Sequence, residues 1–94
     1  MNYLVIGRDH KDAQERRQAQ RSAHLAGAKA LKESGNLLYA VALIEDGNMV
    51  GSVMVFDFET REAFDNWKDN EPYITGDVWG DVEITECAVP PIFK

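Results

Sequence analysis

Apolar residues gather in four short runs along the chain, and two longer amphipathic segments separate these runs. Residues 2–8, 37–44 and 49–58 are apolar at both alternating positions, whereas residues 82–86 alternate between apolar and polar side chains. Residues 13–34 contain no helix-breaking residue except one glycine, and residues 60–68 repeat apolar residues at helical spacing. A period of two residues indicates a strand and a period of 3.6 indicates a helix. The pattern therefore predicts strand, helix, strand, strand, helix and strand, in that order.

Local signals place the ends of the first helix and of the hairpin. Asp12 and Glu15 have the spacing of a capping box, so we expect Asp12 to be the N-cap of the first helix. Gly35 follows the helical segment and suits its C-terminal end. Asp46-Gly47 lies between the second and third runs, which predicts a tight hairpin turn.

Other signals bound the C-terminal half of the chain. Thr60 is the expected N-cap of the second helix, which is predicted to run to about Lys68. We interpret residues 69–76 as irregular, because Pro72 cannot continue the preceding helix. Regular structure is expected to end at Pro90-Pro91.

The predicted order of elements is typical of a ferredoxin-like α+β domain that comprises residues 1–94. This β-α-β-β-α-β fold has a four-stranded antiparallel sheet with two helices on one face. A sheet covered on one face should alternate in polarity, but three of the predicted strands are apolar at both parities. We therefore predict a homodimer in which the open sheet faces stack against each other. The alternative is that these long strands simply carry extra valines.

Composition and charge exclude several classes of protein. A net charge of −6 disfavours binding to nucleic acid, and no apolar run approaches the roughly 20 residues that cross a membrane. The single cysteine, Cys87, cannot form an intrachain disulfide, and the first residues do not resemble a signal peptide. We expect a cytoplasmic protein. No glycine-rich phosphate loop and no cluster of metal ligands is present, so we expect neither a cofactor nor a metal site.

His24 is the strongest candidate for chemistry in this chain. On a helical wheel it shares a face with Ala28 and Leu31, which suit a core, and with Arg17 and Arg21, which do not. A helix that only packed on a sheet would remain apolar along its whole buried face. We infer that the first half of this face borders a cleft. Histidine suits such a position because it exchanges protons near neutral pH.

A working histidine needs a carboxylate to fix its tautomer, and two acids are placed to reach it. Asp9 ends the first strand and Glu71 precedes Tyr73, so either carboxylate is a candidate partner of His24. A guanidinium can bind an anionic substrate, and Arg21 and Arg17 are both candidates for that role. The alternative is a structural or exposed histidine with solvated arginines. His10 lies in a polar loop and is interpreted as incidental.

Several short motifs together resemble the YCII-related (YciI-like) family. They are Arg21-x-x-His24-Leu25, Leu37-Leu38, Gly51-Ser52 and Pro72-Tyr73-Ile74-x-x-Gly76, and the resemblance covers nearly the whole chain. It implies a member of the dimeric α+β barrel superfamily, similar in fold to muconolactone isomerase.

The resemblance also implies a site built on a histidine and a carboxylate, and one relative dehydrochlorinates a chlorinated hydroxyquinol. His24, Asp9 and Tyr73 match family positions, while Glu71 stands where the family usually has aspartate. Ala40-Val41-Ala42 replaces the usual Ala-Gly-Pro.

Two functions are compatible with these residues. The first is a small cofactor-free enzyme in which His24, paired with Asp9 or Glu71, moves a proton in an isomerisation or elimination. Its substrate would be a small anionic or phenolic ring compound, positioned by Arg21 in a pocket lined by Tyr73. The second is a non-catalytic dimeric domain that binds a small molecule or another protein.

Overall fold

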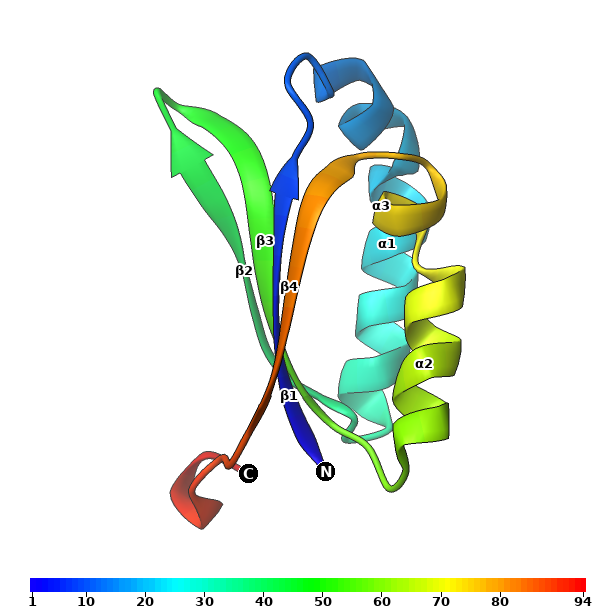
Figure 1. Cartoon of the computed structure of the whole chain (residues 1–94), viewed down its shortest axis with the longest axis vertical. Coiled ribbons are helices and arrows are strands. Elements are labelled where there is room, and N and C mark those ends of the chain that lie inside the picture. The colour runs from blue at the N-terminus through cyan, green and yellow to red at the C-terminus, as the bar shows by residue number, and fades with distance from the viewer.

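A computed structural model describes residues 1–94, which form an α+β fold with one layer of strands and one layer of helices (Figure 1). Two long helices and four strands make up most of it, and two short helical turns complete it. The elements in chain order are β1 (Asn2–Asp9), α1 (Gln14–Glu33), β2 (Leu37–Glu45), β3 (Asn48–Asp57), α2 (Arg61–Asn70), α3 (Pro72–Thr75), β4 (Trp79–Cys87) and the 3-10 turn η1 (Pro91–Phe93).

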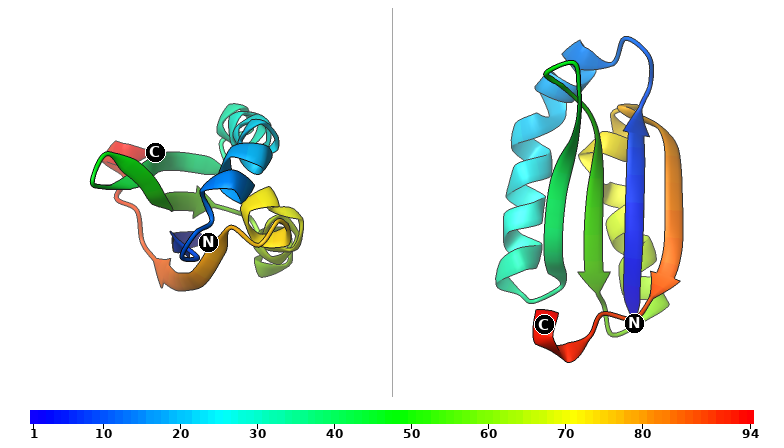
Figure 2. Two further views of the ribbon diagram at one scale, coloured as in Figure 1. Left: turned by 90° about the horizontal axis from the view of Figure 1, so that it is seen from above. Right: turned by 90° about the vertical axis from the view of Figure 1, so that its left-hand side faces the viewer.

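The four strands form one antiparallel sheet in the order β2-β3-β1-β4. Both long helices lie on the same face of this sheet, as Figure 1 shows edge-on and the right-hand view of Figure 2 shows from the open side. The predicted ferredoxin-like fold is confirmed. None of the helices combines the length and the apolar character that a membrane crossing requires.

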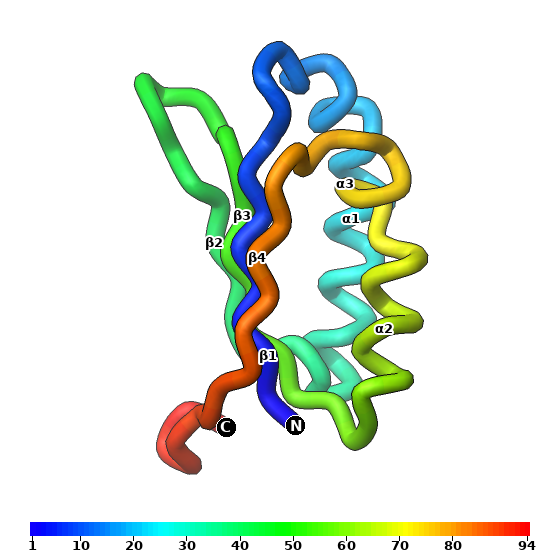
Figure 3. Tube along the Cα trace, viewed as in Figure 1, coloured from blue at the N-terminus to red at the C-terminus, as the bar shows by residue number.

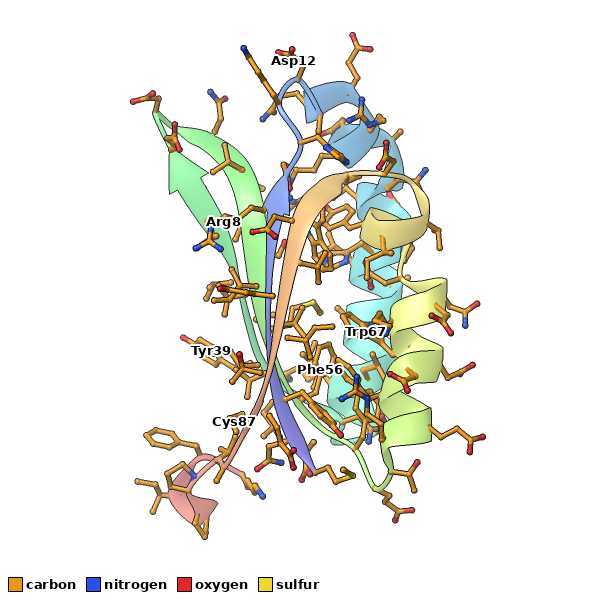
Figure 4. All side chains as sticks on the ribbon, viewed as in Figure 1. Arg8, Asp12, Tyr39, Phe56, Trp67 and Cys87 are labelled. Carbon is orange, nitrogen blue, oxygen red and sulfur yellow. The ribbon has the colours of Figure 1, made fainter.

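The hydrophobic core lies between the sheet and the helices. Tyr3 pairs with Phe56 and Val5 with Met54, so their side chains share the face that the helices cover, and all four are buried. Phe64 of α2 stacks on Tyr3 with ring centroids 4.2 Å apart. Figure 4 shows Phe56 and Trp67, from opposite layers, in this space.

The opposite face of the sheet carries apolar side chains that nothing in the chain covers. Register places Leu4 beside Val55 and Ile6 beside Val53, one residue out of phase with the core. On the neighbouring strand β2, Tyr39 is 68% exposed and Val41 is 44% exposed. Tyr39 points away from the helices in Figure 4. The sequence pattern of strands apolar at both parities thus corresponds to a sheet with two apolar faces.

Most predicted ends of elements agree with the structure. Gly35 has a φ of 83° and follows α1, which confirms a glycine in the left-handed conformation at the helix end. Asp46 and Gly47 have φ values of 50° and 81°, as a type I′ hairpin turn requires. The predicted cap Asp12 is wrong. Its φ is 63° and Ala13 is the N-cap, because a turn precedes the first helical residue.

The region after α2 is more regular than predicted. Thr60 caps α2 as expected and accepts a hydrogen bond from the backbone N–H of Ala63 at 3.1 Å. The segment interpreted as irregular contains the short helix α3, because Pro72 occupies its first turn, where a missing N–H costs nothing. Strand β4 begins at Trp79, three residues before the predicted start, and the turn η1 follows Pro90.

Candidate functional site

His24 lies in the middle of α1 with its ring between the helix layer and the sheet. It is 8% exposed, and its Nδ1 is in hydrogen-bond contact with Oε1 of Glu71. An ionised carboxylate is a hydrogen-bond acceptor only, so a neutral imidazole beside it carries its proton on Nδ1. Nε2 then has a free lone pair. The pair therefore has the arrangement of a general base oriented by a carboxylate.

Glu71 is held at the corner where α2 ends and α3 begins, which Figure 3 shows as a sharp bend in the chain. Its Oε1 also accepts a hydrogen bond from the backbone N–H of Tyr73 at 3.2 Å. Pro72 follows directly and fixes the backbone of the first turn of α3. The sequence Glu71-Pro72-Tyr73 thus orients the carboxylate from its own backbone before His24 contacts it.

Close contact between α3 and α1 brings the two halves of the pair together. An added Cβ at Gly76 would lie 2.7 Å from the Gln20 side chain of α1 and 2.7 Å from the Pro72 carbonyl oxygen. A larger residue would therefore push α3 away from α1. Glycine at position 76 allows the approach that places Glu71 beside His24.

Two aromatic rings fix the plane of the imidazole. Tyr73 stacks on His24 with ring centroids 3.9 Å apart and an interplanar angle of 10°. Trp79 meets His24 edge-on at 6.2 Å. The indole lies over Gly7 of β1, where any side chain would overlap it. Packing as well as hydrogen bonding therefore limits rotation of His24.

Asp9 does not contact His24 but forms a buried ion pair with Arg17 of α1. Nη1 of Arg17 donates to the two carboxylate oxygens of Asp9 at 2.9 and 3.1 Å, and both side chains are at most 6% exposed. Nη2 donates to the Gly51 carbonyl at 3.1 Å and to Oγ of Ser52 at 3.2 Å. The guanidinium also lies over the Tyr73 ring, 4.7 Å from its centroid. Arg17 thus ties β1, β3 and α3 to α1.

Burial shifts the pKa of two groups in this cluster. Removal from water raises the pKa of the Asp9 carboxyl, although the neighbouring Arg17 opposes that shift. Burial also raises the pKa of the Tyr73 hydroxyl, against the opposing charges of Arg17 and Arg21. Tyr73 therefore keeps its phenolic proton at neutral pH.

A pocket of about 190 Å³ opens between α1 and strands β2 and β3, and we call it the dyad pocket. Its lining includes His24 and Tyr73. Arg17 and Arg21 form the cationic side of the pocket. Arg21 contacts the sulfur of Met49 and pairs with no carboxylate, so it contributes uncompensated positive charge. The pocket combines a proton acceptor with a cationic anchor.

Polar atoms of the cluster remain available for a further hydrogen bond. Nε of Arg17 and the hydroxyl of Tyr73 are buried without a partner, as is Nε1 of Trp79. Buried polar groups are normally paired, and unpaired ones are often found at sites of function. No group of three or more His, Cys, Asp or Glu side chains is placed to hold a metal ion.

The structure brings most of the sequence-derived candidates together but divides them into two groups. His24, Glu71 and Tyr73 are in mutual contact, and Arg21 joins them along the pocket. Asp9 belongs to the pair with Arg17. The role of Trp79 was not predicted, and no sequence signal marks it. His10 lies outside the site and pairs with Asp77 in the loop region.

Comparisons with known proteins identify relatives of nearly the whole chain. The YCII-related domain matches residues 1–88. The protein YciI of Escherichia coli O6:H1 is 33% identical over 91 residues, which cover 89% of this chain and 93% of that protein. An uncharacterised protein of Haemophilus influenzae is also 33% identical, over 89 residues covering 87% of this chain and 91% of its own.

A solved structure extends the likeness to the fold. It is 5-chloro-2-hydroxyhydroquinone dehydrochlorinase (TftG) from Burkholderia phenoliruptrix AC1100, in complex with 2,5-dihydroxybenzoquinone. It superposes with a TM-score of 0.84 at 18% identity and covers 94% of each chain. The family match over residues 1–88 and the two relatives at 33% identity show which family the chain belongs to. The dehydrochlorinase, at 18% identity, shows the fold alone. This chain belongs to the YCII-related family.

Proposed function

We propose that this protein is a small acid–base enzyme that transfers protons on a hydroxylated single-ring compound. The observation that carries the proposal is the buried contact between His24 and Glu71, with the imidazole oriented by Tyr73 beside a pocket. Nε2 of His24 would take a proton from a ring hydroxyl and return one to a ring carbon. General acid–base catalysis of this kind accelerates reactions by about 10²–10⁴-fold.

The dyad pocket favours a small anionic or phenolic ligand. Its volume of about 190 Å³ is below the roughly 300–1,000 Å³ of sites for larger ligands, so it suits one ring. Arg21 supplies an unpaired positive charge for a phenolate or carboxylate oxygen. Tyr73, which lines the pocket, supplies a hydroxyl that lacks a partner. The related fold of the dehydrochlorinase, with its quinone ligand, supports the same class.

An elimination of HCl would fit these groups and needs no oxidant. A hydroxyl proton leaves the ring while the carbon that carries chlorine gains a proton, which gives a ketone. A second hydroxyl proton then leaves together with chloride, and the product is a quinone. The ring is oxidised as the carbon–chlorine bond is lost. His24 accepts and returns the protons, and Glu71 stabilises its charged form.

The ligand class is tested by titrating the protein with 2,5-dihydroxybenzoquinone and following the NMR signals of the pocket residues. We expect the wild-type protein to bind, because a charge-assisted hydrogen bond to Arg21 is worth about 1.5–3 kcal/mol. Arg21→Met should therefore weaken binding by about 10- to 100-fold. Arg16→Met is the matched control, since the Arg16 side chain is exposed and bonds the Asp77 carbonyl outside the pocket.

A second variant tests the location of the ligand. Ala42 is an exposed residue of β2 whose side chain borders the dyad pocket, so Ala42→Phe should fill the pocket and abolish binding. Ala26→Phe places the same ring on the outer face of α1 and should bind as the wild type does. Unchanged affinity in both Arg21→Met and Ala42→Phe would rule out this pocket as the site.

We further propose that the protein is a homodimer that joins the open sheet faces of two copies. The face is apolar across three strands, with Leu4, Ile6, Val53 and Val55 beside the exposed ring of Tyr39. Contiguous apolar patches of several hundred Å² are rare on monomers. A two-fold axis through this face would bury the same patch on both copies.

The dimer is tested by size-exclusion chromatography with light scattering at micromolar concentration. We expect a mass twice the 10.6 kDa of one chain. Val53 pairs with both Ile6 and Val41 at the centre of the face, so Val53→Lys should give the single-chain mass. Ala26→Lys adds the same charge to the outer face of α1 and should leave the dimer intact. A wild-type mass of 10.6 kDa would contradict the proposal.

A further inference from the structure

The His24–Glu71 pair lies between two separate openings. His24 borders the dyad pocket between α1 and the sheet. Glu71 borders a larger groove of about 720 Å³ between α1 and α2, which we call the helix groove. No residue lines both cavities. The two side chains in contact therefore face different parts of the protein surface.

The outer atoms of the pair are both reached by solvent. The Nε2 atom of His24 and the Oε2 atom of Glu71 have no hydrogen-bond partner in the protein. The hydrogen bonds of these two side chains are made by Nδ1 of His24 and Oε1 of Glu71. The unpaired side-chain atoms that are fully buried are Arg17 Nε, Tyr73 Oη and Trp79 Nε1. His24 Nε2 and Glu71 Oε2 are also unpaired but do not belong to this fully buried set. Nε2 and Oε2 therefore retain contact with solvent, although the residues are only 8% and 3% exposed.

The helix groove is suited to carry water to the carboxylate. Gly27 forms part of its α1 wall, and an added Cβ there would meet no atom within 4 Å. Asn66 and Asn70 form part of its α2 wall and are exposed. Trp67 also lines it and packs against the core. The groove is thus open and polar at the end of α2, where Glu71 begins the next turn.

We propose that Glu71 is the proton exit of the site, so that the pair exchanges protons with bulk water through the helix groove rather than through the dyad pocket. This inference rests on the proposed acid–base function. A substrate that fills the dyad pocket isolates Nε2 of His24 from water. Once Nε2 has accepted a proton, the Nδ1 proton of the imidazolium can pass to Oε1 of Glu71, and rotation of the protonated carboxyl group then turns this proton toward water in the helix groove. Glu71 then has a transfer role in addition to orienting the ring.

The test measures how fast the ring Nδ1–H proton of His24 exchanges with water, by NMR saturation transfer on the substrate-free protein. Ala42→Phe fills the dyad pocket, and exchange should stay within about twofold of wild type. Adding Gly27→Leu and Asn70→Leu, which narrow the helix groove from both walls, should slow exchange by at least about tenfold. Gly27 has room for the new side chain, and a leucine favours the helix more than glycine does.

Matched variants separate blockage from other effects of substitution. Gly27→Ala stiffens α1 equally but is too short to cross the groove, and Ala26→Leu adds the same side chain outside it. Both should exchange as the wild type does. Slowing by Ala42→Phe alone, or no slowing when the groove is filled, overturns the proposal. If the variant with Ala42→Phe, Gly27→Leu and Asn70→Leu does not fold, the variant with only Ala42→Phe and Gly27→Leu should show the same slowing of exchange. Because no substrate is present, the result is independent of whether the protein turns over any compound.

Discussion

Under the proposed acid–base function, His24→Gln is expected to reduce turnover of a chlorinated hydroxylated ring, tested first with 5-chloro-2-hydroxyhydroquinone, by about 10²–10⁴-fold in kcat. Glutamine keeps a polar side chain of similar reach but cannot accept and release a proton near neutral pH. In the proposed mechanism, the contact with Glu71 and the stacking on Tyr73 hold the imidazole so that Nε2 is the proton acceptor. The measurement is chloride release under anaerobic conditions, which prevents oxidation of the compound by air.

Glu71→Gln separates the charge of the carboxylate from its orienting role. The backbone N–H of Tyr73 donates to Oε1 at 3.2 Å, so the amide oxygen of glutamine should occupy the same place. It can then still accept from Nδ1 of His24, and the ¹⁵N shifts of the ring should show an unchanged tautomer. The loss of negative charge removes stabilisation of the imidazolium. We expect kcat to fall by about 10- to 100-fold, less than in His24→Gln.

His10→Gln is the matched control for both variants. His10 pairs with Asp77 outside the site, and its side chain is 41% exposed, so kcat should not change. Arg21→Met should raise KM rather than lower kcat, because in the proposed function Arg21 holds the ligand and moves no proton. Equal turnover by wild type and His24→Gln would contradict the acid–base proposal. If the wild-type protein and all the variants bound the compound but released no chloride, the result would favour a non-catalytic binding domain.

The sequence was sufficient to predict the fold because strands and helices here follow simple periods. Residues that face the core alternate with residues that face the open side, and Tyr3 and Leu4 illustrate the two sets. The same reasoning placed His24 on a buried face that changes from polar to apolar. The alternation along a strand and the buried face of a helix are properties of single elements. Both are determined by residues within a few positions of each other in the chain.

The partners within the site depend on contacts between distant elements, and the sequence left them open. Asp9 and Glu71 were equivalent as partners of His24, because choosing between them requires the position of the corner before α3. Arg17 stands on the same helical face as His24, and nothing in a wheel distinguishes a substrate anchor from half of an ion pair. The fit of Trp79 over Gly7 is likewise a contact between two strands.

Arg17→Met is expected to lower the free energy of unfolding by about 3–5 kcal/mol, the range found when one partner of a buried ion pair is removed. Methionine fills much of the space of arginine but leaves Asp9 buried without a donor, and it also breaks the bonds to Gly51 and Ser52. Urea denaturation measures the loss. Arg16→Met is again the control, and its exposed side chain should matter by less than about 0.5 kcal/mol.

The cause of this loss can be identified from its dependence on pH and from a second substitution. Burial already raises the pKa of Asp9 while Arg17 opposes the shift, so removing Arg17 should raise that pKa further. The folded state then holds the Asp9 proton more tightly than the unfolded state, whose pKa is close to 3.8. Stability of Arg17→Met relative to wild type should therefore be lowest above the variant's folded-state pKa of Asp9, and it should recover as the pH falls through that pKa.

Arg17→Met combined with Asp9→Leu should regain most of the lost stability at neutral pH, because two apolar side chains can replace a buried ion pair at little cost. The dependence of stability on pH that Asp9 contributes should also be absent from the double variant, which no longer carries that carboxyl group. A double variant no more stable than Arg17→Met would show that the loss arises from the contacts to β3. In that case Arg17 acts mainly as a strut between α1 and the sheet, and the Asp9 carboxylate is not the source of the penalty.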